Sequence, residues 1–189
     1  YRGRNILNWV LINDEKEFGV TVHYVDEGID TGDIILQRSL GIDDKDNYDT
    51  LLRRAYGACA DILFDSLLLL KNNNVKPIKQ IDIDPVGSYC GARKEGDEVL
   101  NWHQNSRNIF NFVRAICSPG PVSRTYVNKN EIKINEVKII KNAPSYIGIP
   151  GQVLSKSKEG YFVKTLDNFI EIIKYEGKIK VGDRLTNMR

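Results

Sequence analysis

The spacing of apolar residues changes near Ser118, and this change limits the folds that the chain can adopt. Before Ser118, apolar residues recur at helical spacing in long stretches, whereas after it they alternate with polar residues over short runs. A period near 3.6 is typical of amphipathic helices, and a period of two is typical of half-buried strands. The sequence therefore predicts a mixed α/β module followed by a small all-β module.

The first module is predicted to contain helices and strands. The mostly apolar stretch 4–13 predicts a buried helix packed on a sheet, and 19–25 and 33–40 predict two strands. Residues 49–71 predict a long amphipathic helix, with Asp49 or Thr50 as the residue that caps its start. Its apolar positions at helical spacing include Leu52, Ala55, Cys59, Ile62, Leu63 and Leu69. These elements are typical of an α/β domain.

The second module is predicted to be a helix followed by a β-barrel. A helix over 106–116 ends at the "SPGP" of 118–121. Short turns then separate five alternating runs, which predict a small closed or nearly closed barrel. These runs are 122–127, 131–140, 151–156, 161–166 and 169–175. We expect an α/β domain over 1–80, a Pro- and Gly-containing linker over 81–102, and the helix with its barrel over 103–189.

Composition excludes several classes of protein. The hydrophobic fraction of 41% is sufficient for a packed core, and no apolar run is long enough to span a membrane. The cysteines, Cys59, Cys90 and Cys117, lie far apart without CxxC spacing or clustered histidines, so we expect neither disulfides nor a metal, and a cytoplasmic location. The chain begins at Tyr1 as though inside a domain, and we expect it to be a fragment.

Charge is distributed unevenly between the two modules. Residues 122–189 hold 13 Lys or Arg against 7 Asp or Glu, whereas residues 1–121 hold 14 against 18. The net charges are therefore +6 and −4. An acidic front part and a basic back part predict modules with different surfaces.

Four acidic residues crowd the connection between the first two predicted strands: Asp26, Glu27, Asp30 and Asp33. On one interpretation they only shape a Gly-rich turn, because Asp often bonds nearby main-chain groups. On the other, Asp30 lies where open α/β sheets bind ligands, and it orients an imidazole. Asp33 and Glu27 are weaker candidates. The residues alone leave both interpretations open.

Other candidates have plain structural explanations. His23 fits the strand pattern and suits a packed or half-exposed role, and His103 lies at a helix entrance. Arg4 is either an ordinary surface cation or a ligand for an anionic or carbonyl group. No nucleophile elbow, GxGxxG or GxxxxGK[ST] motif is present.

Four segments in order resemble the 10-formyltetrahydrofolate-dependent formyltransferases: "YRGRNILNW", "GVTVHYVDEGIDTGDIILQ", "SYCGARKEGDEVLNW" and "SPGPVSRTY". The resemblance covers essentially the whole chain, and the "GIDTGDI" block is its most specific part. It implies the C-terminal part of a doubly wound α/β formyltransferase domain followed by a small OB-like barrel. The family's Asn and His, in a motif N-x-H-x-S-x-L-P, should precede "YRGR", and this chain lacks that motif.

The resemblance also implies roles for particular residues. Asp30 would be the catalytic Asp. The co-substrate 10-formyltetrahydrofolate would be bound by Arg4 and by Asp26, Glu27, Gly28, Ile29 and Asp30. Asn8 and Trp9 would face the amine substrate. No metal is implied.

The implied reaction is transfer of a formyl group to an amine through a tetrahedral intermediate. The missing Asn and His would stabilise its oxyanion and move protons, and Asp30 would orient the His. The wording of "YRGRNILNW" and "SPGPVSRTY" favours an amino-sugar nucleotide as substrate. The basic barrel favours the alternative, methionyl-tRNA formyltransferase. A third interpretation is that the fragment itself is inactive, packing and forming a homodimer. No membrane partner is expected.

Overall fold

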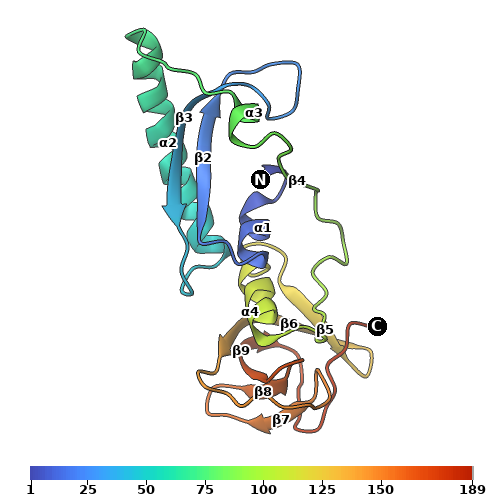
Figure 1. The fold of residues 1–189 in the computed structure, drawn as a ribbon. Helices are drawn as coiled ribbons and strands as arrows, with labels where there is room; N and C mark the ends of the chain where they lie inside the picture. Colours follow the sequence, from blue (N-terminus) through green and yellow to red (C-terminus); the bar gives the residue numbers. More distant parts are fainter. Residues whose placement is uncertain (189) are drawn as a thin grey trace. The chain divides into compact units, whose positions relative to one another are not determined.

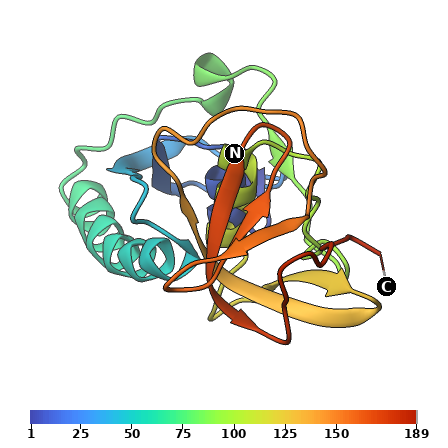
Figure 2. The ribbon, with the colours of Figure 1, turned by 90° about the horizontal axis from the view of Figure 1, so that it is seen from below.

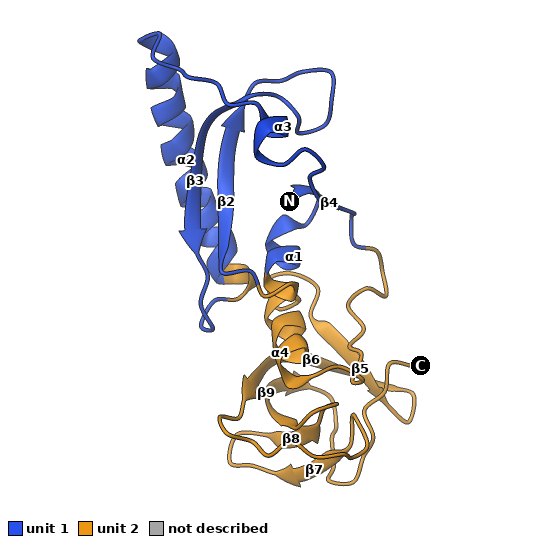
Figure 3. Cartoon of the chain, in the orientation of Figure 1, with its two compact units in different colours: residues 1–10, 15–46, 50–93 blue, residues 11–14, 47–49, 94–189 orange. Residues whose placement is uncertain are grey.

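The computed structural model describes residues 1–188, and these form two compact units (Figures 1 and 3). Of the described residues, unit 1 contains 1–10, 15–46 and 50–93, and unit 2 contains 11–14, 47–49 and 94–188. No helix among residues 1–188 has the length and apolar character needed to cross a membrane.

Unit 1 is built around an antiparallel strand pair and a long helix. Strands β2 and β3 pair from Glu17↔Gly41 to His23↔Ile34, and Figure 1 shows the two strands side by side. Ion pairs from Arg38 to Asp61 and Asp65 join the sheet to the long helix. The elements in chain order are β1 (Arg2–Gly3), α1 (Ile6–Ile12), β2 (Glu17–His23), β3 (Ile34–Gly41), α2 (Tyr48–Lys71), α3 (Gln80–Ile83) and β4 (Tyr89–Cys90). The predicted strands and both predicted helices of this unit are confirmed.

Helix α2 buries a narrower stripe than its apolar pattern suggests. The buried residues are Leu51, Ala58, Ile62 and Ser66. Leu63, which also fits the helical spacing, is 52% exposed, because α2 carries apolar residues on more than one face. The apolar period therefore gives the helix but not the face that packs inward.

The stretch 81–102, expected as a linker, contains part of unit 1. Strand β4 pairs in parallel with β1, with Arg2 opposite Tyr89 and Gly3 opposite Cys90. Main-chain bonds from Arg2 N–H to Ser88 O (2.8 Å) and from Arg4 N–H to Cys90 O (2.9 Å) hold the pair. Residues far apart in sequence are thus brought to one place.

Unit 2 packs helix α4 (Ser106–Ala115) on a five-stranded antiparallel sheet, which Figure 2 shows from below. The strands are β5 (Ser123–Val127), β6 (Asn130–Ile139), β7 (Val153–Lys156), β8 (Tyr161–Lys164) and β9 (Phe169–Glu176), in the order β5-β6-β9-β8-β7. Ile109 and Val113 of α4 join fully buried strand residues such as Ile134 in one core. The predicted helix and all five predicted strands are confirmed.

Residues 183–186 form main-chain hydrogen bonds with both edge strands of this sheet, β5 and β7. Thr186 exchanges two main-chain hydrogen bonds with Tyr126 of β5 (2.9 and 3.0 Å). Val153 of β7 donates to Asp183 O (2.9 Å). Strands β5 and β7 themselves form no ladder with each other within residues 1–188. The structure thus confirms an antiparallel sheet, whereas its closure into a barrel stays a prediction.

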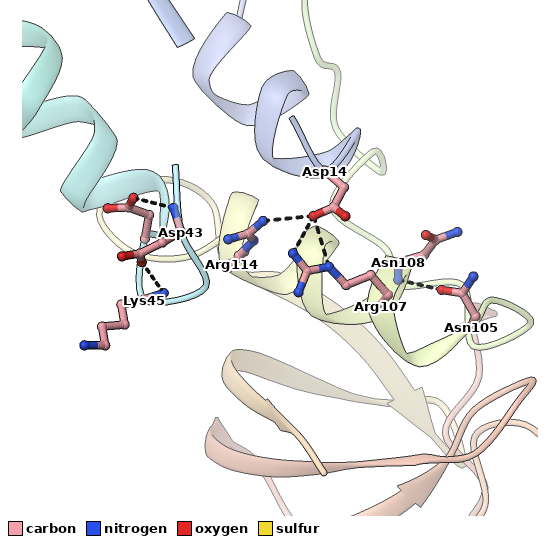
Figure 4. A network of polar contacts seen from close by, with 8 residues as sticks. Asp14, Asp43, Lys45, Asn105, Arg107, Asn108 and Arg114 are labelled. Atoms are coloured by element: carbon pink, nitrogen blue, oxygen red, sulfur yellow. Dashed lines mark hydrogen bonds and ion pairs between the residues drawn. The ribbon is translucent and has the colours of Figure 1, made fainter. Parts of the chain in front are cut away.

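Polar contacts fix both ends of α4. At its start, Asn105 Oδ1 accepts a hydrogen bond from Asn108 N–H (2.7 Å), a typical N-cap (Figure 4). Along the helix, Arg107 and Arg114 lie two turns apart and both reach Asp14 (Figure 4). These ion pairs join residues 11–14 to α4 within unit 2.

Candidate functional site

A cavity of about 570 Å³ lies within unit 1. It is bordered by residues of β1, α1, β2, β3, α2 and α3. The residues that line it include Arg2, Ile6, Phe18, His23, Asp30, Cys59 and Gln80. It therefore combines apolar walls with an imidazole, a guanidinium, an amide and one of the four acidic residues of the connection.

The four acidic residues of that connection do not share one role. Asp26 shapes the turn, because its Oδ1 accepts hydrogen bonds from Gly28 N–H (3.1 Å) and Thr31 Oγ1 (2.6 Å). The bond from Thr31 is the main cause that holds the pKa of Asp26 below its ordinary value. Glu27 is exposed. Turn shaping, proposed for all four as one interpretation, belongs chiefly to Asp26.

Asp30 lies at the cavity and is held from outside its own loop. Its Oδ2 accepts a hydrogen bond from Gly3 N–H (3.4 Å). Its backbone is left-handed, with φ of 57°, a conformation that Asp tolerates better than most residues. The carboxylate is exposed to solvent, as a group that meets a ligand must be.

The two arginines that flank Gly3 differ in environment. Arg2 lines the cavity, whereas Arg4 is exposed and does not. Gly3 between them has φ of +103°, and a Cβ at this position would lie 2.3 Å from Cys90 O. Arg2 Nε and Nη2 donate to Gln80 Oε1 (3.2 and 3.0 Å), and its guanidinium lies 5.8 Å from the ring centre of Tyr89.

Sequence reasoning missed Arg2 and Gln80. Arg2 belongs to the "YRGR" segment, but nothing in that segment distinguishes it from Arg4. Gln80 gives no local signal, because its partners lie far away in sequence.

The remaining predicted site residues lie apart from the cavity lining. Asn8 is buried in α1 (4% exposed), and Trp9 Nε1 donates to Gly91 O (3.3 Å). Ile29 is 74% exposed, and its carbonyl oxygen accepts from the hydroxyl of Tyr89 (3.3 Å). Binding of the amine by Asn8 and Trp9 stays a prediction. Within residues 1–188, no group of three or more His, Cys, Asp or Glu side chains is arranged to hold a metal ion.

The fold and cavity define an α/β unit with a ligand-sized site, joined to an antiparallel sheet domain. Residues 1–67 match the family model described as "Formyl transferase", and residues 93–183 match "Formyl transferase, C-terminal domain". The chain belongs to the formyltransferase family, and the resemblance found in the sequence is confirmed.

The chain is similar to proteins with different names. Over 172 residues the chain is 34% identical to methionyl-tRNA formyltransferase of Streptococcus agalactiae, covering 91% of this chain and 53% of the relative. Over 157 residues it is 38% identical to the bifunctional polymyxin resistance protein ArnA of Wigglesworthia glossinidia brevipalpis, covering 82% of this chain and 23% of the relative.

One similar solved structure is that of WlaRD, a sugar 3N-formyl transferase determined in the presence of dTDP and 5-N-formyl-THF. It is 27% identical with a TM-score of 0.72, covering 95% of this chain and 62% of that one. By comparison, the chain spans about half the length of the methionyl-tRNA formyltransferase that it matches.

Proposed function

We propose that the whole protein transfers a formyl group from 10-formyltetrahydrofolate to the amine of an amino-sugar nucleotide. The observation that carries this proposal is the exposed carboxylate of Asp30, held by Gly3 N–H at the cavity of a formyltransferase-family chain. A sugar 3N-formyl transferase of similar structure, determined with a formylated folate, supports both the donor and the acceptor class.

The cavity suits a ligand of folate size. Its volume falls within the range of about 300–1,000 Å³ usual for small-molecule sites. We propose that residues 26–30 bind the flat ring through exposed main-chain groups, with Gly28 permitting close approach. Arg4, in the "YRGR" segment, is proposed to contribute to binding of the folate. Arg2, in the same segment, adds a cation that lines the cavity itself. The bound donor would supply the electrophilic formyl carbon.

In this proposal Asp30 acts on an imidazole rather than on the formyl group. A carboxylate that accepts a hydrogen bond from a His ring fixes its tautomer and orientation. The 189-residue sequence contains no N-x-H-x-S-x-L-P motif, so the proposed His and Asn partners come from outside it. We therefore expect residues 1–189 alone to be inactive.

The surfaces of unit 1 support this expectation. Strand β2 pairs only with β3 among the described residues, which leaves its other edge without a strand. Helix α2 exposes large apolar side chains, including Leu63, Phe64 and Leu67. Unpaired edges and exposed apolar faces are normally covered. We propose that the first βα units of the catalytic domain cover them.

Methionyl-tRNA formyltransferase is the alternative function. Relatives of that name match 87–97% of this chain, and residues 122–189 carry a net charge of +6, against −4 for residues 1–121. We infer an OB-like barrel for unit 2, supported by the contacts of Thr186 and Asp183 with the edge strands. A basic barrel of this kind suits a nucleic-acid backbone. A homodimer and a cytoplasmic location remain further predictions.

A direct assay separates the two candidates. The whole protein is incubated with 10-formyltetrahydrofolate and either a dTDP-amino sugar or methionyl-tRNA, and the formylated product is detected by mass spectrometry. We expect formylation of the sugar nucleotide. Preferential formylation of methionyl-tRNA, with salt-dependent binding of tRNA, would select the alternative. A normal rate from residues 1–189 alone would contradict the placement of the site.

A further inference from the structure

Gln80 joins two segments that meet at the cavity. Its Nε2 donates a hydrogen bond to Gly32 O (2.7 Å), two residues after Asp30. Its Oε1 accepts from Nε and Nη2 of Arg2, directly before the glycine whose N–H holds Asp30. A single amide therefore bonds both the loop that carries Asp30 and the strand that contacts its carboxylate.

The chemistry of these partners requires an amide at position 80. A guanidinium only donates hydrogen bonds, and a carbonyl oxygen only accepts them. Gln80 presents an acceptor to Arg2 and a donor to Gly32, so both contacts fix the same orientation of its side chain. Glu at this position would lose the donor, and Ala would lose both groups.

Gln80 itself is anchored to the sheet. Ile78, two residues earlier, exchanges two main-chain hydrogen bonds with Ile34 at the start of β3 (2.8 and 3.0 Å). The amide thus extends from a fixed backbone and not from a free loop. Ile34 directly follows the loop that carries Asp30. The main-chain bonds of Ile78 to Ile34 and the side-chain bond of Gln80 to Gly32 therefore both hold that loop.

The base of the loop is tightly packed where Gln80 contacts it. A Cβ placed on Gly32 would lie 1.7 Å from Tyr24 O, so the two chain segments touch at this point. Tyr24 N–H also donates to Asp33 O (2.9 Å) and closes the loop. A displacement of Gly32 would therefore disturb this closure and shift Asp30.

We propose that Gln80 is a positioning residue that sets Asp30 and Arg2 relative to one another. The proposal rests on the proposed function for its catalytic meaning, because it takes Asp30 as the residue that orients the proton-transferring group. Its structural part, that Gln80 fixes loop 24–33, stands without any assumption about the reaction.

The structural part is tested by hydrogen exchange on the whole protein. We expect Gln80→Ala and Gln80→Glu to speed exchange of the Tyr24 amide by about 2- to 10-fold, as for loss of one hydrogen bond. Gln37→Ala is the matched control and should leave exchange of the Tyr24 amide unchanged, because Gln37, which also lines the cavity, donates to Thr21 Oγ1 on the hairpin (2.8 Å) and not to the loop. Unchanged exchange in both Gln80 variants would overturn the proposal. Asp26→Ala is the positive control and should speed exchange of the Gly28 amide, whose N–H donates to Asp26 Oδ1 (3.1 Å).

The catalytic part is tested by kinetics of the whole protein. We expect Gln80→Glu, which keeps the contact with Arg2 but loses the bond to Gly32, to lower kcat by up to about 100-fold. KM for the formyl donor should change less than kcat. Faster exchange with unchanged kcat would overturn the positioning role. If the wild-type protein formylates neither acceptor, the proposed function fails, while the exchange result still decides whether Gln80 holds the loop.

Discussion

Gly3 N–H donates a hydrogen bond to Oδ2 of Asp30 across 27 positions of sequence (3.4 Å). This contact separates Asp30 from its acidic neighbour Asp26, whose carboxylate bonds within the loop to Gly28 and Thr31. The loop thus has one acid that shapes it and another that faces the cavity. In the proposed catalytic role of Asp30, the acid that acts is therefore not also needed to hold the turn.

Asp30→Asn in the whole protein tests the proposed catalytic role. The amide oxygen can still accept from Gly3 N–H, but the negative charge that would orient an imidazole is lost. We expect turnover to fall by about 10² to 10⁴-fold with folate still bound, as for other orienting carboxylates. Asp61→Asn on α2, whose side chain is 73% exposed, is the control. Unchanged turnover in Asp30→Asn would make Asp30 a turn residue.

Much of the fold could be predicted from the sequence because each large element has a periodic apolar face. Strand β6 alternates buried Ile132 and Ile134 with exposed Lys133, and α4 buries Ile109 and Val113 one turn apart. Strands β1 and β4 have two residues each and no period to detect. These strands form because main-chain groups far apart in sequence pair with each other, and such pairing produces no pattern in the local sequence.

The site could be predicted only where a residue belongs to a recognisable segment. Asp30 follows from the "GIDTGDI" block. Arg2 carries no sequence signal that distinguishes it from Arg4, although Arg2 and not Arg4 lines the cavity. Gln80 has no local signal, because its side-chain hydrogen bonds reach two partners 78 and 48 positions away.

Gly3→Ala should destabilise unit 1. At φ of +103° an L side chain is strained, and its Cβ would lie 2.3 Å from Cys90 O in the β1–β4 pair. Strain of this kind costs about 1–3 kcal/mol, which urea unfolding would measure. Gly57→Ala is the matched control in the middle of α2, where a Cβ meets nothing within 4 Å. It should raise stability by about 0.5–1 kcal/mol. Equal effects of the two variants would contradict this account.

Ile170→Ala should strongly destabilise unit 2. Ile170 of β9 is fully buried in the core, so truncation leaves a cavity and costs about 2–5 kcal/mol. Ile147→Ala removes the same atoms from a side chain that is 100% exposed and should change stability by less than about 0.5 kcal/mol. Thermal or urea unfolding followed by tryptophan fluorescence would report on Trp102, a member of the same core cluster. A small effect at Ile170 would mean that the sheet is not packed as described.

Asp167 should make unit 2 less stable in acid. Partial burial opposes ionisation of Asp167, but hydrogen bonds from Ser106 N–H (2.8 Å) and Thr165 Oγ1 (2.9 Å) outweigh it and hold its pKa below the ordinary value of 3.8. The carboxylate also lies at the N-terminus of α4, where negative charge is favourable. Because the unfolded chain binds the proton more readily, this contribution is complete above the unfolded pKa and is lost as pH falls through the folded pKa.

Asp167→Asn tests this sign directly. The variant should be less stable by about 1 kcal/mol at pH 7, as for other contacts at helix N-termini, and the difference from wild type should shrink between pH 5 and pH 3. Urea unfolding at several pH values would measure it. Asp61→Asn, an exposed acid on α2, should show little change at any pH. A difference for Asp167→Asn that is constant from pH 7 to pH 3 would indicate that packing of the side chain, and not its charge, stabilises the start of α4.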